Sequence, residues 1–464
     1  MIVMKFGGTS VQDAAAIKRV TEIVSGCADR APVVVVSAMA RVTDMLLRIA
    51  RTAKERRFDE VSSLIEQLRR RHLETAHQLL LFSADSPLGE SPEPLNRIIL
   101  DHFSNLENLA HSVATLGELT PRSQDAIASF GEQLSSLLVM MALVERGVPA
   151  QLMDARFFIT TDDHFTSAIP SLVETESAAR RVLLPIIEQG QVPVTQGFIG
   201  ATADGVTTTI GRGGSDYSAA LIGAALGAEA IEIWTDVDGL MTADPRVVPN
   251  ARRIRIISFS EASELSYFGA KVLHPSTVLP AIEREISVHI YNTNNPACEG
   301  TLIVARPRPS RNLIKSIAFK RGVTIVNVTS TRMLLAYGFL RTIFEVFDRH
   351  QTSVDVVTTS EVSVSMTLDN TDRLEAIKRD LSGIGEVAIE REKAIVCVVG
   401  DNLKFTPGVA ARLFRAIEST NVNMISQGGS EINLTFVIDE SEVDRVVRSL
   451  HEEFFAEVDS EVFD

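Results

Sequence analysis

A lysine followed by two glycines lies near the start of the chain, where an apolar segment meets a helix-like run. Lys5 belongs to the apolar segment 1–6, Gly7 and Gly8 follow it, and the pattern of 12–24 is helical. Backbone N–H groups at a glycine turn, a helix N-terminus and an ammonium group all favour an anion, most often phosphate. The spacing is not that of a Walker loop, G-x-x-x-x-G-K-[ST], which occurs nowhere in the sequence. The segment therefore predicts phosphate binding, with a plain strand-to-helix turn as the alternative.

A second candidate is the glycine-rich segment 208–218, where a predicted strand meets three glycines and a helix that runs to Leu226. Ser215 or Asp216 would begin this helix. Arg212 offers a fork for a carboxylate, the glycine backbone offers donors for phosphate, and Asp216 places an acid near both. The segment is not a dinucleotide-binding fingerprint, because Asp216 stands where the third glycine would be. A glycine-rich turn with an N-cap is the alternative.

Three polar residues of the first half could complete a site. Ser37 and Thr43 follow the apolar strand 33–36, and ligands of parallel sheets bind beyond the carboxyl ends of strands. Thr43 or Asp44 could instead cap the next helix. Glu132 lies off the apolar stripe of its predicted helix, so periodicity favours a solvated charge. Only the neighbouring Gly131, which could admit a ligand or backbone closely, argues for a role in binding.

Two later segments could contact a nucleotide. Thr235 and Asp236 follow another predicted strand in a loop that reaches Arg246, and this loop could hold a base, a ribose and phosphate. It lacks the spacing of an EF-hand, and a plain acidic turn is the alternative. Lys271 offers a second lysine that, with Lys5 and Mg²⁺, would balance the charge of a triphosphate. Taken alone, a lysine such as Lys271 is more often a solvated charge.

These segments require a scaffold of strands and helices. Apolar runs of this kind predict a buried, mainly parallel sheet with helices on both faces. The predicted elements are strands at 1–6, 33–36 and 230–234, helices through most of 43–148, a hairpin at 192–210 and a linker at 306–311.

Beyond the linker the sequence repeats itself. The offset is 70 residues both from Gly338 to Gly408 and from Asp369 to Asp439. Each copy has the pattern helix, strand, strand, as in a ferredoxin-like βαββαβ unit. Chance similarity is the alternative. A duplicated unit after a catalytic-looking domain predicts a binding surface rather than a second reaction centre.

Composition excludes several classes of protein. The 464 residues predict about two to four domains with full cores. A net charge of −15 argues against nucleic acid or an anionic membrane as the main partner. Cys27, Cys298 and Cys397 lie far apart without a C-x-x-C pair, which is typical of a reducing compartment. The N-terminal segment lacks the pattern of a signal peptide, so we expect a cytoplasmic protein.

Taken together, the segments closely resemble the aspartate kinases of the amino-acid kinase family, and the tandem repeat resembles their pair of ACT regulatory domains. The matching motifs are Lys5-Phe-Gly-Gly-Thr-Ser, the Ser37 to Thr43 loop, Phe130-Gly-Glu132, Gly211-Arg-Gly-Gly-Ser-Asp216, Thr235-Asp236 to Asp244-Pro-Arg246 and Phe268-Gly-Ala-Lys271-Val-Leu-His-Pro. The resemblance covers essentially the whole chain. It implies an α/β amino-acid-kinase fold at 1–305, followed by ferredoxin-like ACT domains at 312–385 and 386–464.

The resemblance implies transfer of the γ-phosphoryl group of ATP to the β-carboxylate of L-aspartate. A carboxylate is already ionised at neutral pH, so this reaction needs no general base, only positioning and charge neutralisation. No metal ligand of the protein is implied, and Mg²⁺ would come with ATP. The implied site residues are Lys5 on the phosphoryl group; Asp216 on Lys5 or the substrate amine; Ser37, Thr43, Glu132 and Arg212 on aspartate; and Gly7, Gly8, Thr235, Asp236, Arg246, Lys271 and Val272 around ATP.

The resemblance also implies feedback by an end-product amino acid and a homodimer or dimer of dimers formed through the ACT domains. Leu335 and Ala336 replace polar residues of many lysine-inhibited relatives, so threonine, alone or with lysine, is the alternative effector. Met241 replaces a tyrosine that many relatives have beside the nucleotide. The implied effector residues are Met333, Gly338, Phe339, Leu340, Asp355, Ser360 and Glu361.

Two other functions compete with this interpretation. One is an amino-acid kinase for a different acidic substrate, since the motifs do not measure the length of the substrate. The other is an amino-acid sensor with an inactive kinase domain, which predicts loss of Lys5, Arg212, Asp216 or Lys271, and the sequence retains all four. The sequence has no nicotinamide-binding fingerprint, so we do not expect the form fused to homoserine dehydrogenase.

Overall fold

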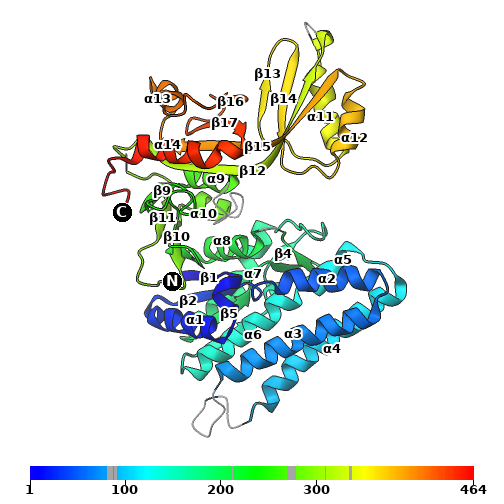
Figure 1. Ribbon diagram of the computed structural model, residues 1–464. Helices are drawn as coiled ribbons and strands as arrows, with labels where there is room; N and C mark the ends of the chain where they lie inside the picture. Colours follow the sequence, from blue (N-terminus) through cyan, green and yellow to red (C-terminus); the bar gives the residue numbers. More distant parts are fainter. Residues whose placement is uncertain (81–86, 88–90, 212, 269–277, 309, 334–336) are drawn as a thin grey trace. The chain divides into compact units, whose positions relative to one another are not determined.

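The computed structural model describes residues 1–464 except 81–86, 88–90, 212, 269–277, 309 and 334–336. The chain divides into two compact units (Figure 1). The first unit consists of 1–240, 256–259 and 272–307, and the second of 241–255, 260–271 and 308–464.

The first unit is built on an eight-stranded sheet whose strand order is β3-β5-β2-β1-β8-β10-β11-β9. All neighbours are parallel except β10 and β11. In this register Phe6 of β1 lies between Val36 of β2 and Trp234 of β8, so the three strands end at one level. The sheet strands are β1 (Ile2–Phe6), β2 (Pro32–Val36), β3 (Ala150–Met153), β5 (Val192–Gln196), β8 (Ala230–Thr235), β9 (Ile256–Ser258), β10 (Ser287–Asn292) and β11 (Thr301–Val304).

The predicted strands and the helical segment after the second of them are confirmed, whereas the hairpin prediction is partly wrong. Segment 192–196 forms β5, a parallel strand of the main sheet. The hairpin pairs only β6 (Ile199–Thr202) with β7 (Thr207–Thr209), and β4 (Thr160–Thr161) completes this small sheet. Gly205 makes the turn with a φ of 78°, as expected for glycine.

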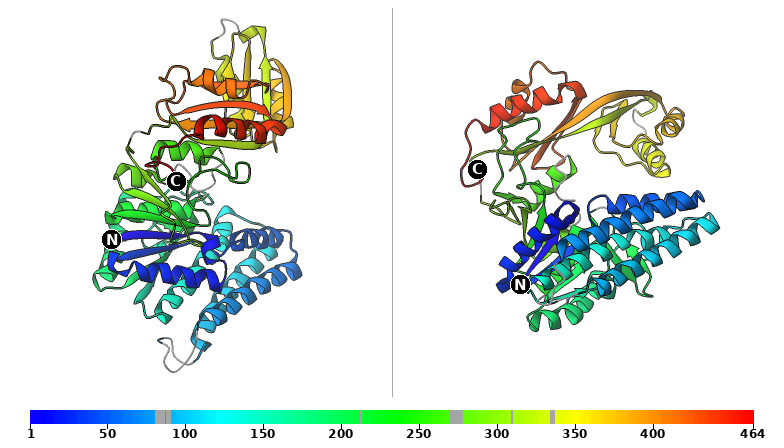
Figure 2. Two further views of the ribbon diagram at one scale, coloured as in Figure 1. Left: turned by 60° about the vertical axis from the view of Figure 1, so that its left-hand side comes forward. Right: turned by 60° about the horizontal axis from the view of Figure 1, so that its bottom comes forward.

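Helices surround the large sheet, and the long helices α3 and α4 lie side by side (Figure 2). Helices α1 to α4 and α6 share one apolar core with the sheet, whereas α7, α8 and α10 pack together. The helices are α1 (Ala14–Gly26), α2 (Val42–Lys54), α3 (Phe58–Leu79), α4 (Glu93–Leu116), α5 (Pro121–Ala128), α6 (Phe130–Glu145), α7 (Leu172–Glu188), α8 (Gly214–Leu226) and α10 (Leu279–Glu283).

One stretch of the described residues, Pro121–Glu145, is long and apolar enough to cross a membrane by length and composition alone. It covers α5 and α6, and 72% of its most apolar window is buried inside the fold. This burial is what a core helix of a globular domain requires, and α6 packs against β2, β3 and β5.

The second unit contains a six-stranded antiparallel sheet of order β13-β14-β12-β15-β17-β16. Two long strands, β12 and β15, pass through both halves of this sheet. The strands are β12 (Ile314–Thr329), β13 (Val357–Thr359), β14 (Ser363–Leu368), β15 (Glu386–Gly400), β16 (Met424–Gln427) and β17 (Asn433–Asp439). The helices are α9 (Phe259–Tyr267), α11 (Phe339–Arg349), α12 (Leu374–Leu381), α13 (Val409–Ala416) and α14 (Val443–Phe455).

The predicted repeat is visible in this sheet. Gly338 and Gly408 occupy equivalent positions before α11 and α13, with φ values of 77° and 82° that favour glycine. The second half of β12 pairs with β14, while its first half pairs with 395–400 of β15. Each half of the sheet thus has four strands in ferredoxin-like order, and β12 contributes to both.

Within the second unit, helix α9 is fastened to β12 by a buried ion pair. Lys315 Nζ lies 3.0 Å from Glu261 Oε2, and the two side chains are 2% and 3% exposed. Charges removed from water this completely are tolerated because each stabilises the other. The pair therefore fixes the first turn of α9 on the six-stranded sheet.

We expect Lys315→Met to destabilise the protein by about 3 kcal/mol, because it removes the ammonium group that stabilises the buried Glu261 carboxylate. Urea unfolding followed by fluorescence and circular dichroism measures the loss. Lys378→Met, at an exposed position of α12, is the matched control and should change stability little. Equal effects of the two substitutions would contradict the role given to the buried pair.

Candidate functional site

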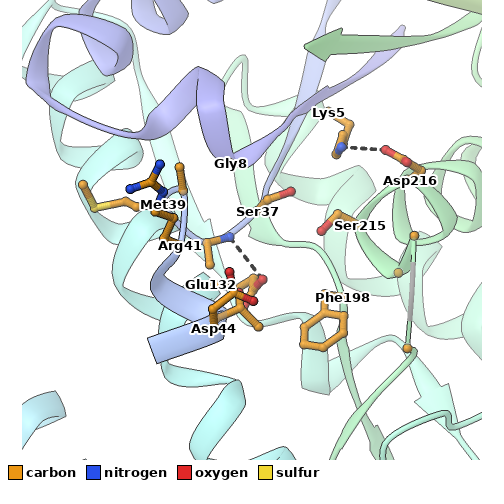
Figure 3. A pocket seen from close by; sticks show the side chains of 16 residues that line it. Lys5, Gly8, Ser37, Met39, Arg41, Asp44, Glu132, Phe198, Ser215 and Asp216 are labelled. Carbon is orange, nitrogen blue, oxygen red and sulfur yellow. Dashed lines mark hydrogen bonds and ion pairs between the residues drawn. The ribbon is translucent and has the colours of Figure 1, made fainter. Parts of the chain in front are cut away.

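A cavity of about 390 Å³ in the first unit opens beyond the carboxyl ends of β1 and β2 (Figure 3). Its walls come from the loops after these strands, from the first turns of α2, α6 and α8, and from the glycine-rich segment before α8. Six predicted site residues line it, although four different segments of sequence carry them: Lys5, Gly8, Ser37, Thr43, Glu132 and Asp216.

Lys5 and Asp216 form an ion pair at the cavity (Figure 3). Lys5 Nζ lies 2.6 Å from Asp216 Oδ1, and each side chain is 11% exposed. Asp216 belongs to the first turn of α8, where a negative charge is favoured by the helix dipole. The sequence left open whether Asp216 faces Lys5 or a substrate amine, and in the structure it contacts Lys5.

The two glycines after Lys5 allow the backbone to pass close to its neighbours. A Cβ atom on Gly8 would lie 2.9 Å from the carbonyl oxygen of Ala38, which is too close. A Cβ atom on Gly7 would lie 3.7 Å from Lys5 Nζ, within the space in front of the ammonium group. A glycine here leaves room for an anionic group to reach the lysine.

Glu132 is buried at the cavity, contrary to the expectation from periodicity. Glu132 is 3% exposed, and its Oε1 accepts a hydrogen bond of 3.1 Å from the backbone N–H of Ala38. Desolvation raises its pKa to about 8, and this bond opposes the shift only in part. Oε2 has no hydrogen-bond partner among the described residues.

The expectation failed because α6 is buried on most sides, so its sequence has no polar face that separates solvated from buried positions. Gly131 was the informative signal. A Cβ atom there would lie 2.8 Å from the Cβ of Ala38, so glycine lets α6 approach the loop after β2 and bring Glu132 to Ala38.

Thr43 and Ser37 line the cavity from the loop between β2 and α2. The alternative that Thr43 or Asp44 caps α2 is wrong. The N-cap is Arg41, in a left-handed conformation with a φ of 67°, and no side chain caps this end. Both hydroxyl-bearing residues therefore border the cavity without a capping role.

The helix after the glycine-rich segment also begins without a side-chain cap. Helix α8 begins at Gly214, its N-cap is Gly213 with a φ of 72°, and no side chain caps it. The N–H groups of a first helical turn have no intrahelical partners, so this turn presents donors at the cavity. Arg212 lies outside the described residues.

Two residues that shape the site, one behind its glycine-rich segment and one in the cavity wall, carried little signal in the sequence. Asp125, 1% exposed, accepts hydrogen bonds from the N–H and hydroxyl of Thr209 and from the N–H of Thr166, and so fixes the strand that leads to the glycine-rich segment. Phe198 lines the cavity with a φ of 67°. A bulky residue in this conformation is strained, and such strain clusters at ligand sites. Neither an isolated acid nor an aromatic predicts these roles.

The predicted ATP residues are only partly described. Thr235 ends β8, beside β1, and its hydroxyl donates a hydrogen bond of 3.2 Å to the exposed Asp236. Arg246 belongs to the second unit, where its guanidinium pairs with Asp244 at 2.6 Å and lowers the pKa of that carboxyl. Lys271 and Val272 lie outside the described residues.

The predicted effector residues belong to the first repeat of the second unit. Gly338 precedes α11, Met333 packs against the core of this repeat, and Ser360 and Glu361 are exposed between β13 and β14. Phe339 and Leu340 form the first turn of α11. The side chain of Asp355 is only 2% exposed, and Tyr267 and Lys320 both contact it.

Comparisons with known proteins agree with this architecture. Residues 1–292 match the model of the amino acid kinase family, and 396–454 match an ACT domain. The lysine-sensitive aspartokinase 3 of Escherichia coli is 38% identical, over 98% of this chain and 99% of its own. The crystal structure of E. coli aspartokinase III with aspartate and ADP has a TM-score of 0.84 at 37% identity, covering 98% of this chain and 100% of that one. Its complex with lysine and aspartate gives 0.83, with coverages of 98% and 99%.

Identity at this level over nearly the full length of both chains, together with the cavity between Lys5, Glu132 and the first turn of α8, shows the family. The chain is a member of the aspartokinases, enzymes of the amino acid kinase family with C-terminal ACT domains.

Proposed function

We propose that this chain transfers the γ-phosphoryl group of ATP to the β-carboxylate of L-aspartate in the cavity beyond β1 and β2. The observation that carries the proposal is that a cation and a buried carboxylate lie at the same cavity. Lys5 supplies a cation beside a glycine turn, and Glu132 supplies a buried carboxylate whose Oε2 lacks a partner among the described residues. The E. coli relative solved with aspartate and ADP supports this assignment.

On the nucleotide side, Lys5 stabilises the charge on the transferring phosphoryl group, and Asp216 orients Lys5. Gly7 leaves space for the phosphates in front of the ammonium group, and Gly8 lets the turn approach the backbone of Ala38. Bound with ATP, Mg²⁺ would supply further neutralisation of the phosphate charge. The remaining residues proposed around ATP are Thr235, Asp236, Arg246, Lys271 and Val272.

On the substrate side, Glu132 binds the α-ammonium group of aspartate. An ammonium within contact distance favours the ionised carboxylate, so binding lowers the raised pKa of Glu132 and releases its proton. Arg212 holds the α-carboxylate as a bidentate partner, and Ser37 and Thr43 donate hydrogen bonds. The β-carboxylate attacks as the anion it already is at neutral pH, without a general base.

Regulation is proposed for the second unit. An end-product amino acid, lysine or threonine, binds the first repeat through its ammonium group at Asp355 and Glu361. The effector loop is completed by Met333, Gly338, Phe339, Leu340 and Ser360. We further propose a cytoplasmic homodimer or dimer of dimers through the ACT domains, with domain limits of 1–305, 312–385 and 386–464. The E. coli relative solved with lysine supports an amino-acid effector.

The reaction can be tested by trapping the acyl phosphate as a hydroxamate in the presence of ATP and Mg²⁺. We expect a signal with L-aspartate, and a signal with glutamate alone would overturn the substrate. Lys5→Ala should lower kcat by about 10²-fold or more, because the developing charge loses its cation, while ATP still binds. Lys18→Ala, at an exposed position of α1, is the matched control. Near-normal turnover of the Lys5 variant would refute its role.

The role of Glu132 predicts a pH dependence of aspartate binding. Below a pKa of about 8 the free enzyme holds this carboxyl protonated, so KM for aspartate should fall as pH rises towards 8, by up to about tenfold per unit. Glu132→Gln should abolish this dependence and raise KM roughly 10- to 100-fold through loss of the charged partner. Initial rates between pH 6 and 8.5 measure both effects.

Raising the pH should improve the binding of aspartate at Glu132 but lower the stability of the fold. Because folding raises the pKa of Glu132 from 4.5 to about 8, the folded state binds more protons in this range, and stability falls as pH rises through it. Glu132→Gln should therefore melt about 2–4 °C above the wild type at pH 8 and lose this advantage towards pH 4.5. Glu118→Gln, at an exposed position, is the control.

If Glu132→Gln bound aspartate normally, Glu132 would be excluded from the substrate site.

Asp355→Ala should relieve feedback inhibition, raising the effector concentration for half-inhibition by about tenfold or more, because the ammonium group loses its carboxylate. Uninhibited kcat should fall only partly, because the Tyr267 hydroxyl loses its acceptor whereas Lys320 keeps Asp369 as a partner at 2.7 Å. Inhibition curves with lysine, threonine and both test this, with the exposed Asp372→Ala as control. Equal loss of activity and inhibition would indicate a folding defect.

A further inference from the structure

Asp355 is a buried carboxylate that two donors of the second unit already engage. Its Oδ1 accepts a hydrogen bond of 2.6 Å from the hydroxyl of Tyr267, and Lys320 Nζ lies 3.1 Å from its Oδ2. Lys320 also pairs with Asp369 at 2.7 Å and lies 5.4 Å from the centre of the Tyr267 ring. The four side chains form one cluster, defined here as the Asp355 cluster.

Burial decides what a ligand must do to reach this carboxylate. The Asp355 side chain is 2% exposed, whereas Lys320 is 23% and Tyr267 is 46% exposed. The two donors therefore cover Asp355 and are themselves open to solvent. A carboxylate that already holds an ammonium group at 3.1 Å has the chemistry to hold another, but only in exchange for one of its present partners.

Charge keeps the cluster together. Burial by itself would lower the pKa of Lys320, but hydrogen bonds and charges from Asp369 and Asp355 raise it above its usual value. Lys320 in turn lowers the pKa of Asp369. Lys320 also screens the repulsion between Asp369 and Asp355. Because it pairs with both carboxylates, it keeps Asp369 as a partner when Asp355 binds another cation.

Tyr267 connects the cluster to α9, a helix of the second unit whose sequence lies within the match to the amino acid kinase family. It is the last residue of α9, whose first turn is fixed to β12 through the pair between Glu261 and Lys315. Both side chains of the first attachment are 2–3% exposed, whereas the second attachment includes Tyr267, which is 46% exposed and can exchange its partner. Lys271, proposed above for ATP, follows four residues after Tyr267 in the sequence.

We propose that the effector's ammonium group and the Tyr267 hydroxyl compete for the Asp355 carboxylate, so that effector binding releases the C-terminal end of α9. This inference rests on the effector site proposed above. In this proposal Tyr267 is the residue through which the first repeat acts on α9. Lys320 is an internal competitor that sets the affinity of the site for the effector. A ligand that binds by displacing a contact stabilises the state in which that contact is broken.

The consequence is a linked change in two quantities. Removing the Tyr267 hydroxyl removes the competing bond, so the effector should bind more tightly, by roughly tenfold for one hydrogen bond to a charged group. The same change favours the released state without effector, so basal activity should fall and the further inhibition by effector should shrink. A purely structural role of Tyr267 would lower stability without tightening the binding of effector.

The test uses the full-length Tyr267→Phe protein, with L-lysine and L-threonine titrated by calorimetry and with hydroxamate formation measured in parallel. Tighter binding together with lower basal activity supports the inference, and unchanged or weaker binding overturns it. Lys320→Gln removes the other competitor and should tighten binding in the same way. Tyr291→Phe, which removes a hydroxyl bound to His289 in the first unit, is the matched control and should leave effector affinity unchanged.

Measurements on the wild type separate this inference from the proposed function. If the wild type forms hydroxamate and is inhibited, and Asp355→Ala relieves the inhibition, the effector site stands. If Tyr267→Phe then bound the effector with unaltered affinity, only the proposed competition would be refuted. A wild type that binds neither amino acid would overturn the effector site and, with it, the inference.

Discussion

The ion pair between Lys5 and Asp216 is the interaction on which the catalytic unit depends. It joins the end of the central strand β1 to the first turn of α8, and so fixes the cation at the point where a glycine turn and a helix N-terminus converge. Such a pair becomes possible because β1, β2 and β8 end at one level in a parallel register. A lysine held by one carboxylate at 2.6 Å is oriented, and it can still turn its remaining N–H groups to a phosphoryl group.

Two buried carboxylates near this pair illustrate how the same burial can serve structure or function. Asp125 accepts three hydrogen bonds and thereby holds the approach to the glycine-rich segment, whereas Glu132 has one backbone donor and an Oε2 without a partner among the described residues. Burial raises the pKa of both, but only Glu132 is left under-solvated at a cavity. An acid in this condition destabilises the unliganded fold and gains most from a cationic ligand, which in our proposal is the ammonium group of aspartate.

The sequence predicted those features that depend on local pattern. Apolar runs indicated the central parallel strands, and the glycine segments indicated the cavity at their ends. The errors arose where long-range packing decides the outcome. Segment 192–196 joined the main sheet instead of a hairpin, Glu132 was buried by a helix without a polar face, and the strained Phe198 left no trace in composition. The contact of Tyr267 with Asp355 spans 88 residues and could not be found without the fold.

The two ACT repeats share a backbone frame but not its chemistry. The N–H of Asp355 donates to the carbonyl of Thr367 in the first repeat, and that of Asn423 donates to the carbonyl of Val437 in the second. The side chains differ at this equivalent point. Asp355 brings a charge that holds Lys320 and Tyr267, while Asn423 brings an amide whose oxygen is buried without a partner among the described residues. An amide cannot balance an ammonium group, so only the first repeat has the charge at this position to exchange an internal cation for an effector.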